Sequence, residues 1–98
     1  MSDCTFTAPA VRDYFAALRH YARLRPKEAQ RFAQHFEYTV HRIITEGLRI
    51  PRHGYDCYAI VVFDYSDYIL YDFDENRPVI VGVANAHRGP DYWKGQRL

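Results

Sequence analysis

The sequence is poor in several features that would mark common classes of protein. Its 98 residues include only two cysteines, Cys4 and Cys57, without CxxC spacing, which argues against a disulfide framework or zinc site and favours reduced thiols in a cytoplasm. No run approaches the roughly 18 apolar residues of a membrane span, and the N-terminus lacks a signal-peptide pattern. HExxH, GxSxG and glycine-rich phosphate motifs are missing too. We therefore expect a cytoplasmic protein without membrane contact, metal or other cofactor.

An excess of charge of either sign is also lacking. The net charge of +1 creates no global field that would attract nucleic acid, and we expect no sequence-specific DNA binding by this chain alone. Cations nevertheless gather around an expected turn between two helices. They are Arg19, Arg23, Arg25, Lys27 and Arg31. Such a one-sided patch suits contact with phosphate or an acidic protein, or is simply a solvated face.

Acids and histidines give no defined catalytic pair. Asp64, Asp67, Asp72 and Asp74 crowd the middle of the chain and could act as general acid and base. Acids at turns and strand edges more often prevent edge-to-edge pairing of sheets. The histidines His35 and His41 are six residues apart on an expected helix, so they face different sides and are interpreted as surface residues.

The N-terminal half has helical periodicity. After a short strand at 4–7, Thr7 can cap a helix that tolerates Pro9 in its first turn and ends near Leu24 or Arg25, before Pro26. Its expected buried face is Val11, Tyr14, Phe15, Leu18, Tyr21 and Ala22. A second helix runs from Pro26 to a stop at Gly47, with Ala29, Phe32, Ala33, Phe36, Val40, Ile43 and Ile44 inward. The short connection predicts an antiparallel helical hairpin.

The C-terminal half has strand patterns. A loop at 48–55 precedes an apolar, β-branched run at 58–63, which predicts a strand buried on both faces. Runs at 68–73 and 79–84 flank a polar turn and predict an antiparallel hairpin. The order (β)ααβββ predicts an α+β fold, a helical hairpin packed on a small antiparallel sheet. The length and the 48% of hydrophobic residues are enough for a single domain, 1–98, with one modest core.

Hydrogen-bonding, cationic and aromatic side chains follow the last strand. A stiff strand that delivers such residues at its end is a usual support for a functional surface. The candidate target-binding residues are Asn85, His87, Arg88, Tyr92, Trp93, Lys94 and Arg97. In the structural alternative, Tyr92 and Trp93 pack back on the sheet and Arg88 is merely exposed.

The stretch from Tyr71 to Trp93 resembles the C-terminal signature of the RelE/ParE family of bacterial toxins, the toxic halves of type II toxin–antitoxin pairs. The residues that carry the resemblance are Tyr71, the strand 79–84, Arg88, Pro90, Tyr92 and Trp93. The order of elements is also that of the family. Three positions depart from its pattern. Asn85 replaces the family's histidine, Asp72 stands where an arginine often follows the strand tyrosine, and Gly89 replaces one of the paired arginines.

The resemblance implies a toxin of the ParE-like branch, connected with plasmid stabilisation, that inhibits DNA gyrase by binding and is neutralised by a cognate antitoxin. An aspartate at 72 would repel the phosphate that RNA-cleaving relatives stabilise with cations, so binding is favoured over enzymatic activity. One alternative is a RelE-like, ribosome-dependent mRNA endoribonuclease. There His87 or Tyr92 would transfer protons and Arg88 would contact the phosphate. A second alternative is a degenerate, non-toxic binding module of the same fold.

Overall fold

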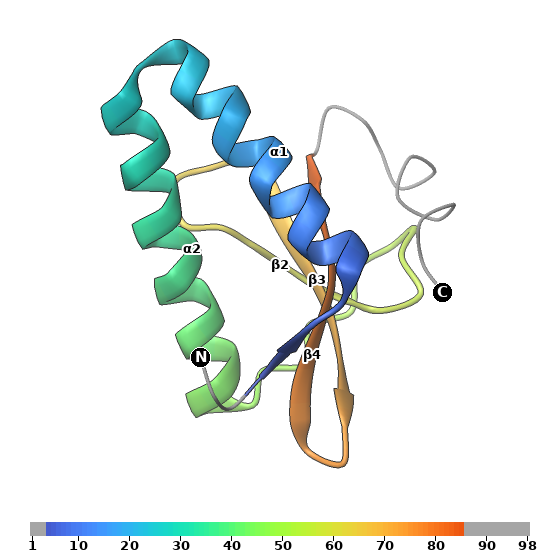
Figure 1. Cartoon of the computed structure of the whole chain (residues 1–98). Coiled ribbons are helices and arrows are strands. Elements are labelled where there is room, and N and C mark those ends of the chain that lie inside the picture. The colour runs from blue at the N-terminus through green and yellow to red at the C-terminus, as the bar shows by residue number, and fades with distance from the viewer. Residues whose placement is uncertain (1–3, 86–98) are drawn as a thin grey trace.

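A computed structural model describes residues 4–85. The elements are β1 (Thr5–Phe6), α1 (Ala8–Leu24), α2 (Pro26–Glu46), β2 (Tyr58–Val61), β3 (Asp67–Asp74) and β4 (Arg77–Asn85). This order confirms the predicted (β)ααβββ arrangement, and both helices lie on one side of the sheet (Figure 1). No helix in this part of the chain is both long and apolar enough to cross a membrane.

The sheet has the strand order β1-β4-β3-β2. The pairs β2–β3 and β3–β4 are antiparallel, as predicted. However, β1 runs parallel to β4, with Thr5 opposite Val79 and Phe6 opposite Ile80. The sheet is therefore mixed rather than purely antiparallel. Pairing between strands at opposite ends of the chain leaves no local sequence signal, so its direction could not be predicted.

Local signals end the helices where the sequence predicts. The Thr7 side chain accepts a hydrogen bond from the Ala10 amide at 3.3 Å, and Pro9 lies in the first turn of α1. Arg25 is extended between the helices, just before Pro26 opens α2. Gly47 ends α2 in the left-handed conformation, with φ 60°, which glycine adopts without steric cost. These ends fix the lengths of both arms of the hairpin.

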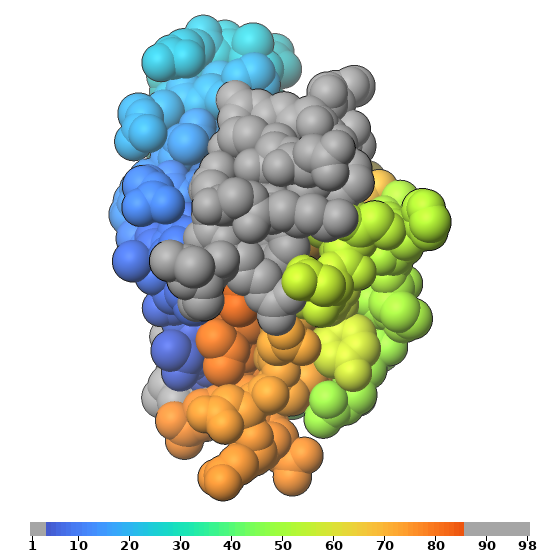
Figure 2. All heavy atoms as spheres, turned by 90° about the vertical axis from the view of Figure 1, so that its right-hand side faces the viewer, coloured from blue at the N-terminus to red at the C-terminus, as the bar shows by residue number. Residues whose placement is uncertain are grey.

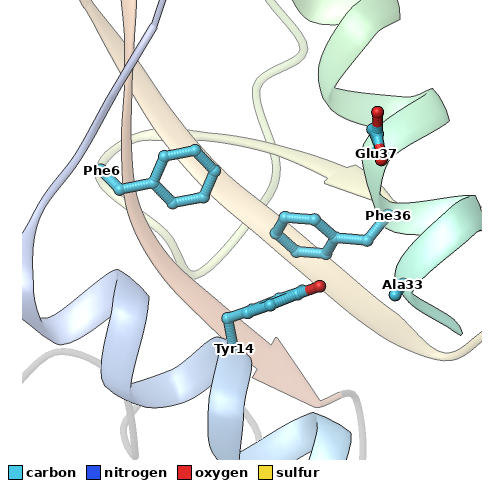
Figure 3. A pocket seen from close by; sticks show the side chains of 5 residues that line it. All are labelled: Phe6, Tyr14, Ala33, Phe36 and Glu37. Carbon is cyan, nitrogen blue, oxygen red and sulfur yellow. The ribbon is translucent and has the colours of Figure 1, made fainter. Parts of the chain in front are cut away.

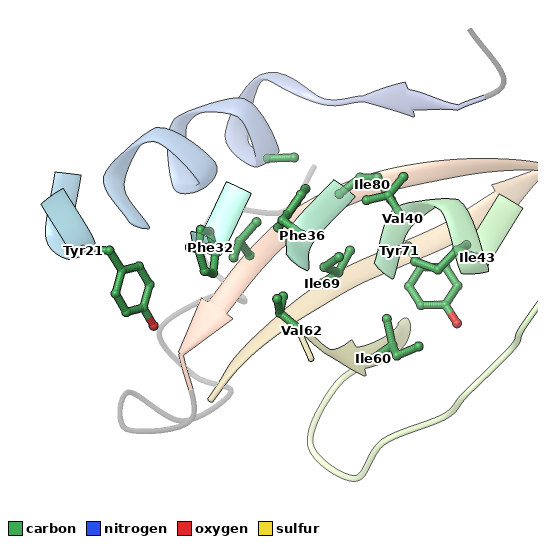
Figure 4. Close-up of a cluster of buried hydrophobic side chains, with 12 residues drawn as sticks. Tyr21, Phe32, Phe36, Val40, Ile43, Ile60, Val62, Ile69, Tyr71 and Ile80 are labelled. Carbon is green, nitrogen blue, oxygen red and sulfur yellow. The ribbon is translucent and has the colours of Figure 1, made fainter. Parts of the chain in front are cut away.

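The main core lies between the helical hairpin and the sheet (Figure 4). It includes Tyr21, Phe32, Phe36, Val40, Ile43, Ile60, Val62, Ile69, Tyr71 and Ile80. The predicted inner face of α2 is confirmed, because Phe32, Val40 and Ile43 are fully buried.

The predicted inner face of α1 is partly wrong. Val11 and Phe15 are 41% and 50% exposed, and Ala22 is exposed as well. The helix instead turns Ala10 and Asp13 inward, and the Asp13 carboxylate accepts a hydrogen bond from the Val83 amide of β4 at 3.1 Å. Beyond its short pairing with β1, β4 presents the Val83 amide toward α1. The buried Asp13 carboxylate binds this amide, and the helix is therefore rotated relative to its apolar stripe.

The prediction of a strand at 58–63 buried on both faces is partly wrong, although Ala59 and Ile60, which point to opposite faces, are both buried. The strand β2 ends at Val61 and is the last strand of the sheet, with β3 on one side and only a short bridge from Pro51 to Tyr58 on the other. Val61 and the following Phe63 are 45% and 57% exposed. An apolar run of this length predicts burial but cannot show that one neighbouring strand is lacking.

Candidate functional site

The candidate site lies at the end of the sheet where β3 begins and β4 stops. Asp67, the first residue of β3, is opposite Asn85, the last residue of β4, and Asn85 is half-buried. The other predicted target-binding residues lie outside the described residues. They are His87, Arg88, Tyr92, Trp93, Lys94 and Arg97. The structure therefore shows the position of Asn85 and of the strand residues beside it, which we call the base of the site (Figure 1).

A buried tyrosine–carboxylate pair holds this base. Tyr21 of α1 donates its hydroxyl hydrogen bond to the Asp67 carboxylate, and the two residues are only 9% and 5% exposed. Burial, and then the hydrogen bond to Asp67, raise the pKa of Tyr21 well above its ordinary range. A buried carboxylate needs such a donor. The pair ties α1 to the residue opposite Asn85. Periodicity places Tyr21 in the apolar core, but it does not reveal that its hydroxyl binds an acid 46 residues away.

This pair makes a prediction for Tyr21→Phe. The substitution removes the donor to buried Asp67, so we expect the free energy of unfolding at pH 7 to fall by about 1–3 kcal/mol. The pKa of Tyr21 is raised above its unfolded value of 10.0. The stability it contributes is therefore complete below about pH 10 and is lost as the pH rises further. Urea unfolding from pH 7 to 11 should show the gap between wild type and variant narrowing above pH 10. A constant gap would contradict the assignment.

A second network joins the turn at 62–66 to α2. Arg31 donates hydrogen bonds to Glu28 at 3.2 Å and to Asp64 at 2.9 Å, and the Tyr65 hydroxyl donates to Glu28 at 2.8 Å. The hydrogen bond from Tyr65, followed by Arg31, lowers the pKa of the Glu28 carboxyl. The Tyr65 ring contacts the Tyr21 ring, with centroids 5.1 Å apart. Both helices and the turn are thus connected at the same end of the sheet.

The predicted basic patch is only partly available for binding. All of its cations are exposed, but Arg31 bridges Glu28 and Asp64, and Arg25 lies 3.7 Å from Glu28. For Arg19, Arg23 and Lys27, residues 4–85 provide no ion-pair partner. These three cations remain candidates for contact with an acidic partner. Arg31 has a structural role that the sequence pattern did not reveal.

Cations in the loop at 47–57 lie on aromatic rings. The Arg52 guanidinium is 4.2 Å from the Tyr68 ring centroid and donates a hydrogen bond to its hydroxyl at 2.6 Å. Arg49 is 3.9 Å from the Phe73 centroid. This loop flanks β3 and β4 (Figure 2). Each such stack contributes roughly 0.5–1 kcal/mol at an exposed site, so both arginines help to hold the loop.

Tyr71, the strand residue of the RelE/ParE resemblance, is structural. It is fully buried, and its hydroxyl donates to the Leu48 carbonyl at 2.7 Å. It also accepts from the Ile50 amide at 3.4 Å. Tyr71 therefore holds the start of the same loop. Asp72 follows on β3, so its side chain points to the opposite face of the sheet.

Comparisons with known proteins identify the fold. No family model and no curated protein matches the sequence. The structure is similar to a chain of the chromosomal ParDE TA system from P. aeruginosa, with a TM-score of 0.71 and 16% sequence identity. The match covers 85% of this chain and 94% of the other. The two helices on a four-stranded mixed sheet are thus a ParE-like fold, which confirms the predicted fold class.

Proposed function

We propose that the chain, residues 1–98, is a single toxin domain of a type II toxin–antitoxin system. We place it in the ParE-like branch, with DNA gyrase as the inhibited target. The observation that carries the proposal is the match in fold to a ParDE chain over most of both chains. The order of residues from Tyr71 to Trp93 supports it independently.

The fixed position of Asn85 at the end of β4 favours inhibition by binding to a protein target. The Tyr21–Asp67 pair and the Arg31 network connect three segments at the end of β4, so the following segment starts from a fixed point. Holding Asn85 in place lowers the entropic cost of presenting this side chain to a partner. The proposed contacts are Asn85, His87, Arg88, Tyr92, Trp93, Lys94 and Arg97. Aromatic residues and arginine are the side chains that most often dominate interface energies.

Two residues of β3 favour a function in binding over a function in RNA cleavage. Tyr71 is buried among core residues and cannot reach a substrate, and Asp72 adds negative charge to the neighbouring position. Ribonuclease catalysis requires positive charge where the phosphate becomes more negative. The proposal therefore includes the absence of ribosome-dependent cleavage of messenger RNA.

A cognate antitoxin is the proposed second partner. Large apolar side chains are exposed on both helices and at the edge of the sheet, including Val11, Phe15, Tyr38, Val61 and Phe63. Tyr38 and Phe63 lie together, with ring centroids 6.4 Å apart, and exposed apolar side chains that gather in this way can mark an interaction site. The edge of β2 beyond its bridge to Pro51 can accept an added strand, and an amphipathic helix can cover the hairpin. An antitoxin segment, extended or helical, would bury both surfaces.

The experiment is inducible expression in a bacterial host, alone and with the product of the neighbouring reading frame. We expect growth arrest by the chain alone and normal growth with the neighbour. The purified pair should bind with nanomolar affinity or better, about −12 kcal/mol. An unrelated small protein expressed at the same level is the control. If the neighbouring product binds no better than this control, the proposal loses its partner and is rejected.

A further inference from the structure

A pocket of about 200 Å³ opens between β1, α1 and α2. It is lined by Phe6, Tyr14, Ala33, Phe36 and Glu37 (Figure 3). Phe6 lies opposite Ile80 in the middle of β4, so the pocket is separate from the end of the sheet that carries Asn85.

Aromatic rings from three elements form the walls. The Tyr14 and Phe36 centroids are 4.7 Å apart, and the Phe6 and Phe36 centroids are 6.3 Å apart. The rings of Phe6, Tyr14 and Phe36 converge on one space, and Ala33 leaves room beside them (Figure 3). Aromatic faces carry negative electrostatic potential, so such walls attract a cation as well as an apolar group.

Among the described residues that line this pocket, Glu37 supplies the only formal charge. It is exposed, and the described part of the chain offers no hydrogen-bond or ion-pair partner for its carboxylate. Burial, and then the charge of Glu37, raise the pKa of the Tyr14 hydroxyl. An anion would be repelled by this carboxylate, whereas a cation would be attracted both by the carboxylate and by the faces of the rings.

We propose that this pocket receives a basic side chain, lysine or arginine, from a bound protein partner. The stem would pack between the rings of Phe6, Tyr14 and Phe36, and the charged end would reach Glu37. The aromatic surface continues outside the pocket, because the half-exposed Phe15 ring lies 5.5 Å from the Tyr14 ring. A polypeptide covers such a surface, whereas a small ligand would fill the pocket alone. The inference rests on the proposed function only in identifying this partner as the antitoxin.

The experiment is an NMR titration of the full chain with two matched probes, N-acetyl-lysine methylamide and N-acetyl-norleucine methylamide. Norleucine keeps the four-carbon stem and lacks the ammonium group. We expect the lysine probe to shift the ring signals of Phe6, Tyr14 and Phe36 and to bind about 2- to 30-fold more tightly, the range of a cation–π contact. Glu37→Gln should reduce this preference. Glu46→Gln, an exposed acid of α2 outside the pocket, should leave it unchanged.

Three results would overturn the inference. Equal binding of both probes would make the pocket simply apolar, and shifts confined to other residues would place the probe elsewhere. Tighter binding of choline than of the lysine probe would indicate a small-molecule site. The titration requires no toxicity, so it can succeed or fail separately from the growth experiment that tests the proposed function.

Discussion

Replacing Arg88 with alanine is expected to restore growth of bacteria that express the chain, while its melting temperature stays nearly unchanged. Arg88 follows the strand that ends at Asn85, and we propose that it anchors the target. Truncation of an interface anchor typically costs about 2–4 kcal/mol, a roughly 30- to 700-fold loss of affinity. Colony counts after induction, at expression levels matched by immunoblot, would measure the effect.

Arg42→Ala is the matched control for this prediction. It removes the same side chain from α2, where Arg42 is paired with Glu46 at 3.1 Å in a surface contact of small energy. This variant should remain toxic. If Arg88→Ala is as toxic as wild type, the C-terminal segment is structural and the target must be bound elsewhere. The exposed cations of the helical hairpin would then be the next surface to test.

Replacing Phe32 with alanine is expected to remove a large part of the stability of the fold. Phe32 is fully buried, and its ring contacts those of Tyr21 and Tyr65 with centroids 4.8 and 5.1 Å away. Loss of a buried phenylalanine costs about 3–5 kcal/mol, compared with roughly 5–15 kcal/mol for the total stability of a domain. The melting temperature should fall by about 12 to 40 °C for a domain of this size.

Phe15→Ala deletes the same side chain from α1, where it is 50% exposed. We expect this control to lose less than about 1 kcal/mol, because exposed substitutions have small effects. Thermal unfolding followed by circular dichroism would compare the variants. Similar losses of stability in both variants would contradict the placement of Phe32 in the core and of Phe15 on the surface.

Local signals account for the parts of the fold that the sequence predicts well. Thr7, Pro26 and Gly47 are short-range signals, and each marks the start or the end of a helix at the expected position. The hairpin of β3 and β4 has a similar local origin. Glu75 and Asn76 form its turn with φ values of 50° and 72°, a left-handed pair that suits the twist of the strands.

The features that the sequence could not predict depend on contacts between distant residues. The parallel pairing of β1 with β4, the inward rotation of α1 by Asp13 and the Tyr21–Asp67 pair all join segments far apart in the chain. Periodicity treats Asp13 as a surface residue and Phe15 as a core residue, because it cannot detect the amide that Asp13 binds. Of the predicted target-binding residues, the described structure contains only Asn85, so the others stay predictions.

The most direct measurement is DNA supercoiling by purified bacterial gyrase in the presence of the purified chain. We predict that the wild-type chain inhibits supercoiling in a concentration-dependent way and that the cognate antitoxin reverses the inhibition. The Arg88→Ala variant should be a much weaker inhibitor than the Arg42→Ala variant. The contradicting result is full supercoiling activity at saturating wild-type chain, together with cuts at codon positions in messenger RNA on translating ribosomes. Such cuts, lost in Arg88→Ala, would replace the gyrase inhibitor with a ribosome-dependent endoribonuclease.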